Sequence, residues 1–145
     1  MSKPMPPAER EAFLAQPRVA ILSIAEADRG PLAVPVWYLY EPGGDVRIWT
    51  AGNSRKARLL LLAGRASLVV QNPHPPYQYV SVEGPITALE PAQFERDLQP
   101  LALRYLGPEV GARYLASLGG PAAGGGDLLV HLQPEHWLSQ DGALE

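Results

Sequence analysis

The expected fold depends on one stretch of sequence, Ile48-Trp49-Thr50-Ala51-Gly52-Asn53-Ser54-Arg55-Lys56-Ala57. Its apolar first residues end a strand that is predicted over Val46 to Thr50, and Ala51-Gly52-Asn53 form a loop. Ser54 is a favourable N-cap, because its side-chain oxygen can accept a hydrogen bond from a free backbone N–H of a helix. The helix is predicted to run from Ser54 to Ala63 and to end at Gly64, a residue type that favours the left-handed backbone of a C-terminal cap.

The first turn of this helix carries an unusual charge pattern. Arg55 and Lys56 lie at the helix end that already bears about half a positive charge, and Arg58 adds a further cation. A bound phosphate would relieve this repulsion, since it suits both the free N–H groups and the cations. The alternative is a solvated helix start whose cations cost about a few tenths of a kcal/mol. The residues of this turn leave both interpretations open.

Short strands joined by tight turns are predicted on both sides of this stretch. Pro (16 residues) and Gly (14 residues) separate apolar runs rather than gathering in one linker. These runs favour strands at Val19–Ala25, Leu32–Tyr40, Val46–Thr50, Ala66–Gln71 and Tyr77–Leu89, the last with a bend at Gly84-Pro85. Pro35 cannot donate a hydrogen bond to a neighbouring strand, which indicates a sheet edge or a bulge. The short connections favour antiparallel pairing.

Helices are predicted outside the strands. One covers Pro7 to Ala15. Another runs from about Pro91 to Gly107-Pro108, with a kink at Pro100, and a short helix covers Glu109 to Leu118. The first of the two later helices carries an apolar stripe that favours core or dimer packing, made of Phe94, Leu98, Leu101 and Tyr105. A loop at Gly119–Gly126 and a last strand at Leu128–Leu132 are expected before a polar tail.

The composition limits the function classes. A chain of 145 residues with 46% hydrophobic and 19% charged residues fits one globular domain, residues 1–145. The net charge of −3 argues against a nucleic-acid binder. Because there is no cysteine, thiol catalysis, disulfides and cysteine-ligated zinc are excluded. No apolar run is long enough for a membrane span, and no secretory signal is visible, so a cytoplasmic location is expected.

The strand, loop and helix of the opening stretch resemble those of the pyridoxamine phosphate oxidase-like split-barrel flavoproteins. In that family an aromatic-Thr pair ends a strand, and Ser-Arg-Lys-Ala opens the helix that binds the cofactor phosphate. The segment Val34-Pro35-Val36-Trp37-Tyr38 is similar to the family's preceding strand, which runs beside the isoalloxazine ring, and Pro76 to Gly84 is similar to its long strand. The resemblance implies a mainly β fold with flanking helices, a six-stranded antiparallel split β-barrel.

The Pro-Val-Trp strand and the loop Asn72-Pro73-His74-Pro75-Pro76-Tyr77 are most similar to the actinobacterial-type branch of this family, which uses FMN or the deazaflavin coenzyme F-420. The resemblance implies an oxidoreductase that binds such a cofactor at a homodimer interface and transfers a hydride to a small organic acceptor. No catalytic residue is assigned. The cofactor-binding residues that it implies are Pro35, Val36, Trp37, Trp49, Thr50, Ser54, Arg55, Lys56, Gln71, Tyr77 and Tyr79.

Other functions stay open at this point. The chain could bind and sequester flavin or haem without catalysis, or be an FMN-dependent enzyme like pyridoxamine phosphate oxidase. The second hypothesis is disfavoured, because no Arg follows Arg113 to form the family's C-terminal substrate clamp. A structural dimer with solvated cations is a third alternative. His74, His131 and His136 show no metal-ligand spacing, so no metal is expected.

Overall fold

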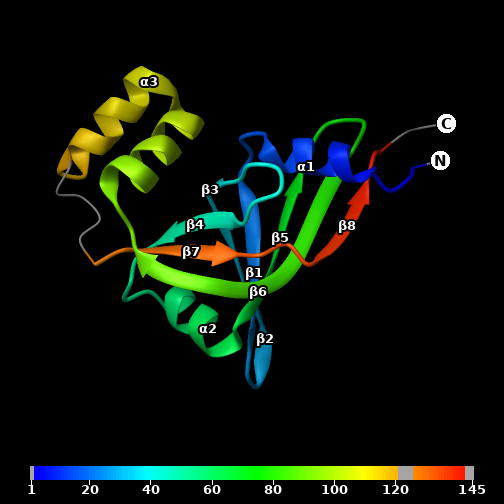
Figure 1. The fold of residues 1–145 in the computed structure, drawn as a ribbon, viewed down its shortest axis with the longest axis horizontal. Coiled ribbons are helices and arrows are strands. Elements are labelled where there is room, and N and C mark those ends of the chain that lie inside the picture. Colours follow the sequence, from blue (N-terminus) through cyan, green and yellow to red (C-terminus); the bar gives the residue numbers. More distant parts are fainter. Residues whose placement is uncertain (1, 121–125, 143–145) are drawn as a thin grey trace.

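The computed structural model describes residues 2–120 and 126–142. The predicted loop Gly119–Gly126 therefore lies largely outside the described residues. Figure 1 shows strands that curl around a common centre, with helices on the outside. In chain order the elements are α1 (Pro7–Ala15), β1 (Ala20–Glu26), β2 (Arg29–Val36), β3 (Tyr38–Leu39), β4 (Val46–Thr50), α2 (Arg55–Ala63), β5 (Arg65–Gln71), β6 (Tyr79–Pro91), the π-helix η1 (Phe94–Leu98), α3 (Gln99–Ser117), β7 (Leu128–Leu132) and β8 (His136–Gln140).

The strands form one antiparallel sheet in the order β2-β1-β5-β6-β7-β4-β3, with β8 also paired to β6. The long strand β6 joins the two halves, because its first part pairs with β5 and β8 and its second part with β7. The predicted antiparallel split barrel is confirmed, although the described part of the chain forms eight strands rather than six. Its additional strands are the short β3 and β8, and the sequence predicted β8 as part of a polar tail.

The change of partners along β6 occurs at the predicted bend. A Cβ atom on Gly84 would lie 1.8 Å from the backbone oxygen of Gln133, so only glycine lets the β7–β8 connection pass this close. Beyond the bend the pairing register of β6 with β7 shifts between Ile86 and Ala88. The bend therefore lets one strand serve both halves of the barrel.

The barrel interior is filled by alternating residues of the strands. Leu22, Leu68 and Val82 are fully buried and lie opposite one another on β1, β5 and β6. Burying each such side chain contributes about 1.5–3 kcal/mol relative to exposure. Helix α1 closes one end of this core with Phe13 and Leu14, and α2 packs against it with residues that include Leu60.

One predicted strand, Leu32–Tyr40, is divided in the structure. Its first part is β2, which pairs with β1, whereas its last residues form β3, which pairs with β4. Trp37 lies between the two, where the chain passes from one half of the barrel to the other. Pro35 lies in β2, one of the edge strands of the sheet, as predicted. Because of this division, Trp37 leaves the strand pairing and contacts Tyr105 and Tyr114 of α3.

The later helices differ in detail from the prediction. Strand β6 extends to Pro91, and helical structure begins only at Phe94. Pro100 lies in the first turn of α3, where proline is tolerated, and does not kink it. The break is at Gly107, whose φ of 77° and ψ of 173° separate α3 into two halves. The predicted division at Gly107-Pro108 is thus confirmed.

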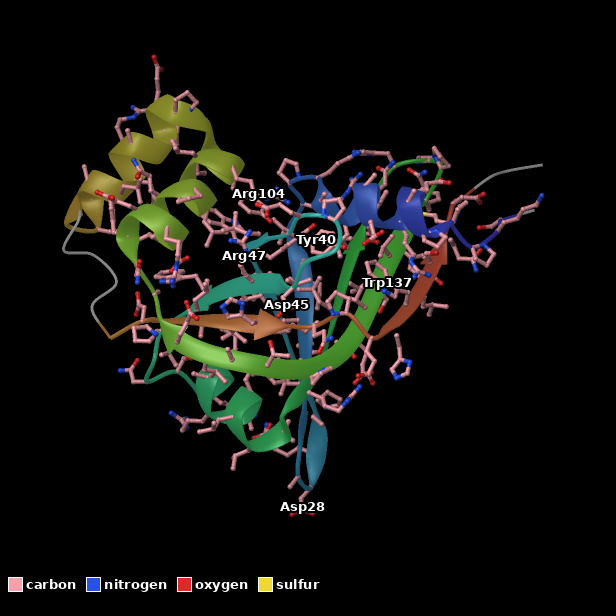
Figure 2. The ribbon with its side chains drawn as sticks, in the orientation of Figure 1. Asp28, Tyr40, Asp45, Arg47, Arg104 and Trp137 are labelled. Carbon is pink, nitrogen blue, oxygen red and sulfur yellow. The ribbon has the colours of Figure 1, made fainter. Side chains whose placement is uncertain are left out.

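Two labelled residues in Figure 2 mark positions far from α3. Asp28 lies at the tip of the β1–β2 hairpin with a left-handed backbone (φ 63°). Trp137 lies on β8 near α1, with the Arg10 guanidinium 4.5 Å from its ring centre.

No helix in the described part of the chain is long and apolar enough to cross a membrane.

Candidate functional site

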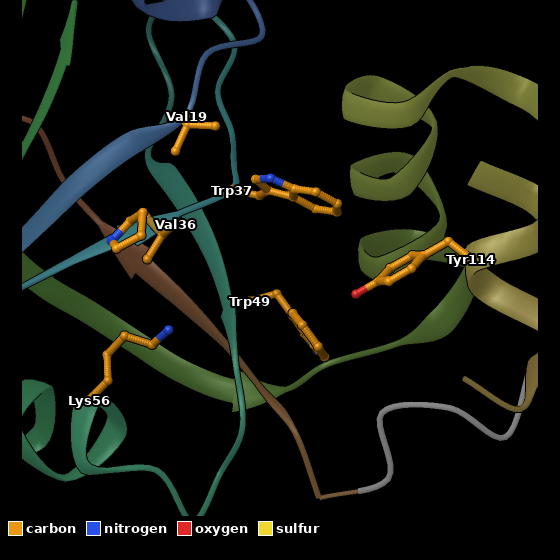
Figure 3. Close-up of a pocket in the computed structure, with 7 residues that line it drawn as sticks. Val19, Val36, Trp37, Trp49, Lys56 and Tyr114 are labelled. Carbon is orange, nitrogen blue, oxygen red and sulfur yellow. The ribbon is translucent and has the colours of Figure 1, made fainter. Parts of the chain in front are cut away.

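A cavity of about 320 Å³ lies between the barrel and α3. Figure 3 shows that its side chains come from both halves of the barrel, from α2 and from the last part of α3. Its lining residues are Val19, Pro35, Val36, Trp37, Trp49, Lys56 and Tyr114. Five of these were predicted as cofactor-binding residues from the sequence, and the structure brings them together at one place.

The amino end of α2 is held by two hydroxyl groups. Ser54 caps the helix by accepting a hydrogen bond from the Ala57 backbone N–H at 3.0 Å, as predicted. Its oxygen also lies 3.2 Å from the hydroxyl oxygen of Thr50, which is almost completely buried at the end of β4. The predicted Thr50 and Ser54 therefore fix the start of α2 against the barrel.

The cations of this helix turn have different environments. Arg55 forms an ion pair with Glu26, the last residue of β1, and Glu26 also lies 3.9 Å from Arg29. Arg58 donates a hydrogen bond to the backbone oxygen of Asn53. The charge conflict inferred from the sequence is thus partly relieved by a carboxylate of the same chain, which reduces the need for a bound anion at Arg55.

Lys56 is the cation that enters the cavity. Its side chain is half-buried, and in Figure 3 its ammonium group points into the space between Val36 and Trp49. Burial lowers the pKa of this ammonium below its ordinary value. Within residues 2–120 and 126–142, no ion pair or hydrogen bond involves the Lys56 side chain. A partly desolvated cation without a carboxylate partner is suited to an anionic ligand.

The walls of the cavity are aromatic. The Trp37 indole is stacked on the ring of Tyr105, with ring centres 5.0 Å apart and planes 4° apart, and the Tyr114 ring meets it edge-on at 5.9 Å. Trp49 packs against a small second core formed by η1 and α3. Its indole N–H is buried and has no hydrogen-bond partner in the described part of the chain. The arrangement can hold a flat ring beside a positive charge.

Gln71 and Tyr79 lie in a neighbouring cavity rather than in the first. This second cavity, of about 430 Å³, is lined by Val19, Ile21, Val69, Gln71 and Tyr79. Val19 lines both cavities, so the two adjoin. Tyr77 is 62% exposed and lines neither. The predicted lining residues therefore fall into two adjoining cavities. Thr50, Ser54 and Arg55 lie beside Lys56 at the start of α2 without lining either cavity, and Tyr77 lies apart from both groups.

One group of side chains has the composition of a metal site. Ligand atoms of Glu83, Glu135 and His136 lie within 4.8 Å of one another. However, the Arg65 guanidinium donates hydrogen bonds to Glu83 at 2.7 Å and to Glu135 at 2.7 Å. The hydrogen bond from Arg65 holds the pKa of the Glu83 carboxyl below its ordinary value. Arg65 thus supplies the positive charge that these carboxylates need.

Two residues of the site were not found from the sequence. Val19 lies directly before β1 and was predicted only as a strand residue. Tyr114 was placed on a short helix without a function. Nothing local marks Tyr114, because it reaches the cavity only through the packing of α3 against Trp37 and Trp49. Tyr105 was predicted as a packing residue and does pack, against Trp37.

Comparisons with known proteins agree with the fold. A sequence profile described as Pyridoxamine 5'-phosphate oxidase matches residues 6–140. An F420 reductase is similar in structure, with a TM-score of 0.72, 21% identity, and coverage of 88% of this chain and 94% of that chain. A conserved hypothetical protein of Mycobacterium tuberculosis gives a TM-score of 0.72 at 20% identity, covering 95% of this chain and 86% of that chain.

A third similar structure is a FAD-binding protein of Mesorhizobium loti, with a TM-score of 0.69, 16% identity, and coverage of 97% of both chains. No match was found among curated proteins. At these identities the solved structures show a shared fold, and the profile match shows that the likeness extends to the sequence over nearly the whole chain.

Proposed function

Because the chain belongs to the pyridoxamine 5'-phosphate oxidase family, we propose that it is an oxidoreductase that binds a flavin-type cofactor and reduces a small organic acceptor. The observation that carries this proposal is Lys56, a half-buried cation that has no carboxylate partner among the described residues and lies in an aromatic cavity at the start of α2. The bound cofactor would supply the hydride chemistry, and the protein would supply binding and orientation.

The residues present fit such a cofactor. Lys56 provides positive charge for a phosphate, and the adjacent first turn of α2 provides free backbone N–H groups. Arg55 can contribute only in competition with Glu26, since the two already form an ion pair. Pro35, Val36 and Trp37 offer backbone and ring surface beside the cavity, and Trp49 forms a further wall. Together they match the two ends of a flavin, one anionic and one flat.

The proposal includes a homodimer with cofactor sites at its interface. One face of the sheet carries a row in register across five strands that is apolar except for Ser81, here called the apolar row and formed by Pro35, Ile21, Val69, Ser81 and Leu138. Ile21 and Leu138 are 41% and 59% exposed. The second cavity opens among these residues, since Ile21 and Val69 line it. A partner copy that covers this face would enclose that cavity and extend the site beyond Lys56.

Cofactor titration tests the proposal. Purified protein is titrated with FMN and, separately, with the deazaflavin coenzyme, by following quenching of Trp37 and Trp49 in a Trp137→Phe background. We expect both to bind and the deazaflavin to bind more tightly. FMN binding tighter by tenfold, about 1.4 kcal/mol, would reverse the order of the two cofactors. No binding of either would contradict the proposal.

Turnover separates an enzyme from a sequestering protein. The reduced holoprotein is mixed with a panel of conjugated acceptors, and oxidation of the cofactor is followed by absorbance. Oxidation that depends on both protein and acceptor supports reductase activity. Tight cofactor binding without acceptor-dependent oxidation across the panel would instead assign a non-catalytic binding protein.

A further inference from the structure

The second half of α3 brings a polar group into the cavity from the side opposite Lys56. In Figure 3, Lys56 lies on one side of the cavity and Tyr114 on the other, with Trp37 and Trp49 between them. The barrel side holds the charged residue together with Pro35 and Val36. The helix side contributes Tyr114 to the cavity lining, with its phenolic hydroxyl, and no charged residue. The two sides therefore suit different chemical groups.

Two tyrosines of α3 contact Trp37, but they have different hydrogen bonds. Tyr105, before the break at Gly107, donates from its hydroxyl to the Arg18 backbone oxygen at 2.7 Å and accepts from the Tyr38 N–H at 3.2 Å. Its hydroxyl is thus used within the protein, and it holds α3 and Trp37 against the barrel. Tyr105 is therefore a structural residue of the site.

Tyr114, after the break, has a different environment. Its ring packs with the second core and edge-on against Trp37. Its hydroxyl points into the cavity in Figure 3 and makes no hydrogen bond to any residue that the structure describes. A hydroxyl with no acceptor among the described residues, set between flat aromatic walls, is suited to the oxygen of a conjugated compound.

We propose that Tyr114 is the residue that selects the acceptor, and that the acceptor class is flat conjugated carbonyl compounds whose oxygen accepts a hydrogen bond from the Tyr114 hydroxyl. This inference rests on the proposed function, since it assumes that the cofactor occupies the Lys56 side. The acceptor lies on the α3 side of the cavity, and its oxygen faces the Tyr114 hydroxyl. Tyr114 acts on acceptor affinity and leaves the cofactor on the opposite side unaffected.

A matched pair of probes tests the hydrogen bond. 1,4-Naphthoquinone and naphthalene have the same ring system, but only the quinone has carbonyl oxygens, and the protein has no cysteine for the quinone to modify. Their binding to the oxidised holoprotein is measured by equilibrium dialysis. Tyr114→Phe keeps the ring and removes the hydroxyl. We expect it to weaken quinone binding by about three- to tenfold and to leave naphthalene binding unchanged.

Two further measurements make the result specific. Arg113→Ala alters the exposed neighbour of Tyr114 and should change the binding of neither probe. Cofactor affinity, measured on the same samples, should equal that of the wild type in both variants. Equal losses of affinity for quinone and naphthalene in Tyr114→Phe would show that Tyr114 acts only by packing, and would overturn the inference. Unchanged affinity for both probes would overturn it as well, and so would a wild type that binds no quinone.

Failure of this inference can be distinguished from failure of the proposed function. If the wild type binds neither flavin nor deazaflavin, the proposed function fails and this inference falls with it. If the wild type binds a cofactor and Tyr114→Phe binds quinone as well as the wild type does, only the assignment of Tyr114 is wrong.

Discussion

Arg55 at the start of α2 is paired with Glu26 at the end of β1, residues 29 positions apart in the sequence. Glu26 thereby places a carboxylate at the amino end of a helix whose own first turn contains no acidic residue. This is the favourable position for a negative charge on a helix. Glu26 thus stands at the helix end where the proposed phosphate would bind, and it competes with that phosphate for Arg55.

Removing this competitor should strengthen phosphate binding. Glu26→Gln frees Arg55 but keeps the size of the side chain. Because exposed ion pairs contribute about 0.2–1 kcal/mol, we expect FMN affinity to rise by up to about fivefold. Riboflavin, which has no phosphate, should bind equally to both proteins in the same titration. Glu41→Gln, which removes an exposed partner of Arg47, is the control. Equal gains for FMN and riboflavin would contradict a phosphate at Arg55.

Lys56 should contribute to cofactor binding but not to folding. Lys56→Met removes the charge and keeps most of the aliphatic side chain, so packing changes little. Loss of one charge-assisted contact should weaken cofactor binding by about 1.5–3 kcal/mol, or about ten- to a hundredfold. The unliganded variant should be as stable as the wild type or slightly more stable, because a cation has left the positive end of a helix.

Thermal melting with and without saturating cofactor checks this prediction. The wild type should gain a ligand-dependent rise in Tm, and Lys56→Met should lose most of it. Arg58→Ala, on the same helix but outside the cavity lining, should retain the rise. A full rise in Lys56→Met would mean that the cation is merely solvated.

The apolar row on the sheet should form the dimer interface. Light scattering at micromolar concentration is expected to give about twice the 15.7 kDa chain mass. Leu138→Lys places a charge in the row and should shift the protein toward monomer, whereas the same change at Leu62, which is 81% exposed on α2, should not. A wild type that is monomeric under these conditions would rule out a shared site.

Asp97 should make the stability of the η1–α3 region depend on pH. This side chain is fully buried and accepts hydrogen bonds from the Gln93 N–H at 2.7 Å and from Arg96 at 2.8 Å. Burial alone would raise the pKa of the carboxyl, but these hydrogen bonds outweigh it and hold the pKa below its ordinary value. The folded state therefore keeps Asp97 ionised at pH values where the unfolded chain takes up a proton.

The sign of the effect follows from the lowered pKa. The stabilisation is fully present above the unfolded pKa and is lost as the pH falls through the folded pKa. Asp97→Asn should cost about 1–3 kcal/mol at neutral pH, and its difference from the wild type should shrink below about pH 4. Urea unfolding at several pH values measures this. Asp28→Asn at the hairpin tip, where Asn tolerates the same left-handed backbone, is the control. A difference that does not vary with pH would contradict the prediction.

Some features of the site depend on neighbouring residues and were predictable. Ser54 caps α2 and Gly64 ends it with a left-handed backbone (φ 70°), as the sequence indicated. Pro35 lies on an edge strand because proline lacks the N–H that an interior strand requires. The position of Lys56 at the helix start also follows from spacing alone. These predictions needed only residues within a few positions of one another.

Other features depend on contacts between distant segments and were not predictable. The apolar pattern of Leu32–Tyr40 did not reveal that the chain changes from one half of the barrel to the other at Trp37, since both parts are apolar in either arrangement. The charge conflict at Arg55 looked unrelieved, because Glu26 approaches it only through the packing of α2 against β1. The strand β8 lacked a clear alternating pattern, and it exists because β6 offers an open edge there.

The sequence by itself determined the antiparallel strands and the cation-rich start of α2, because strand periodicity, turn residues and helix caps act over short distances. The barrel and the family came from the resemblance of the Ile48–Ala57 stretch and its neighbouring strands to known flavoproteins. Only the tertiary structure decided which of Arg55 and Lys56 pairs with a carboxylate of the described chain, and which aromatic rings face the other. Lys56 rather than Arg55 enters the cavity because Glu26 lies beside Arg55. Tyr114 joins the cavity because α3 is broken at Gly107 and packs back on Trp37 and Trp49. Such contacts arise from folding of the whole chain, and no local pattern encodes them.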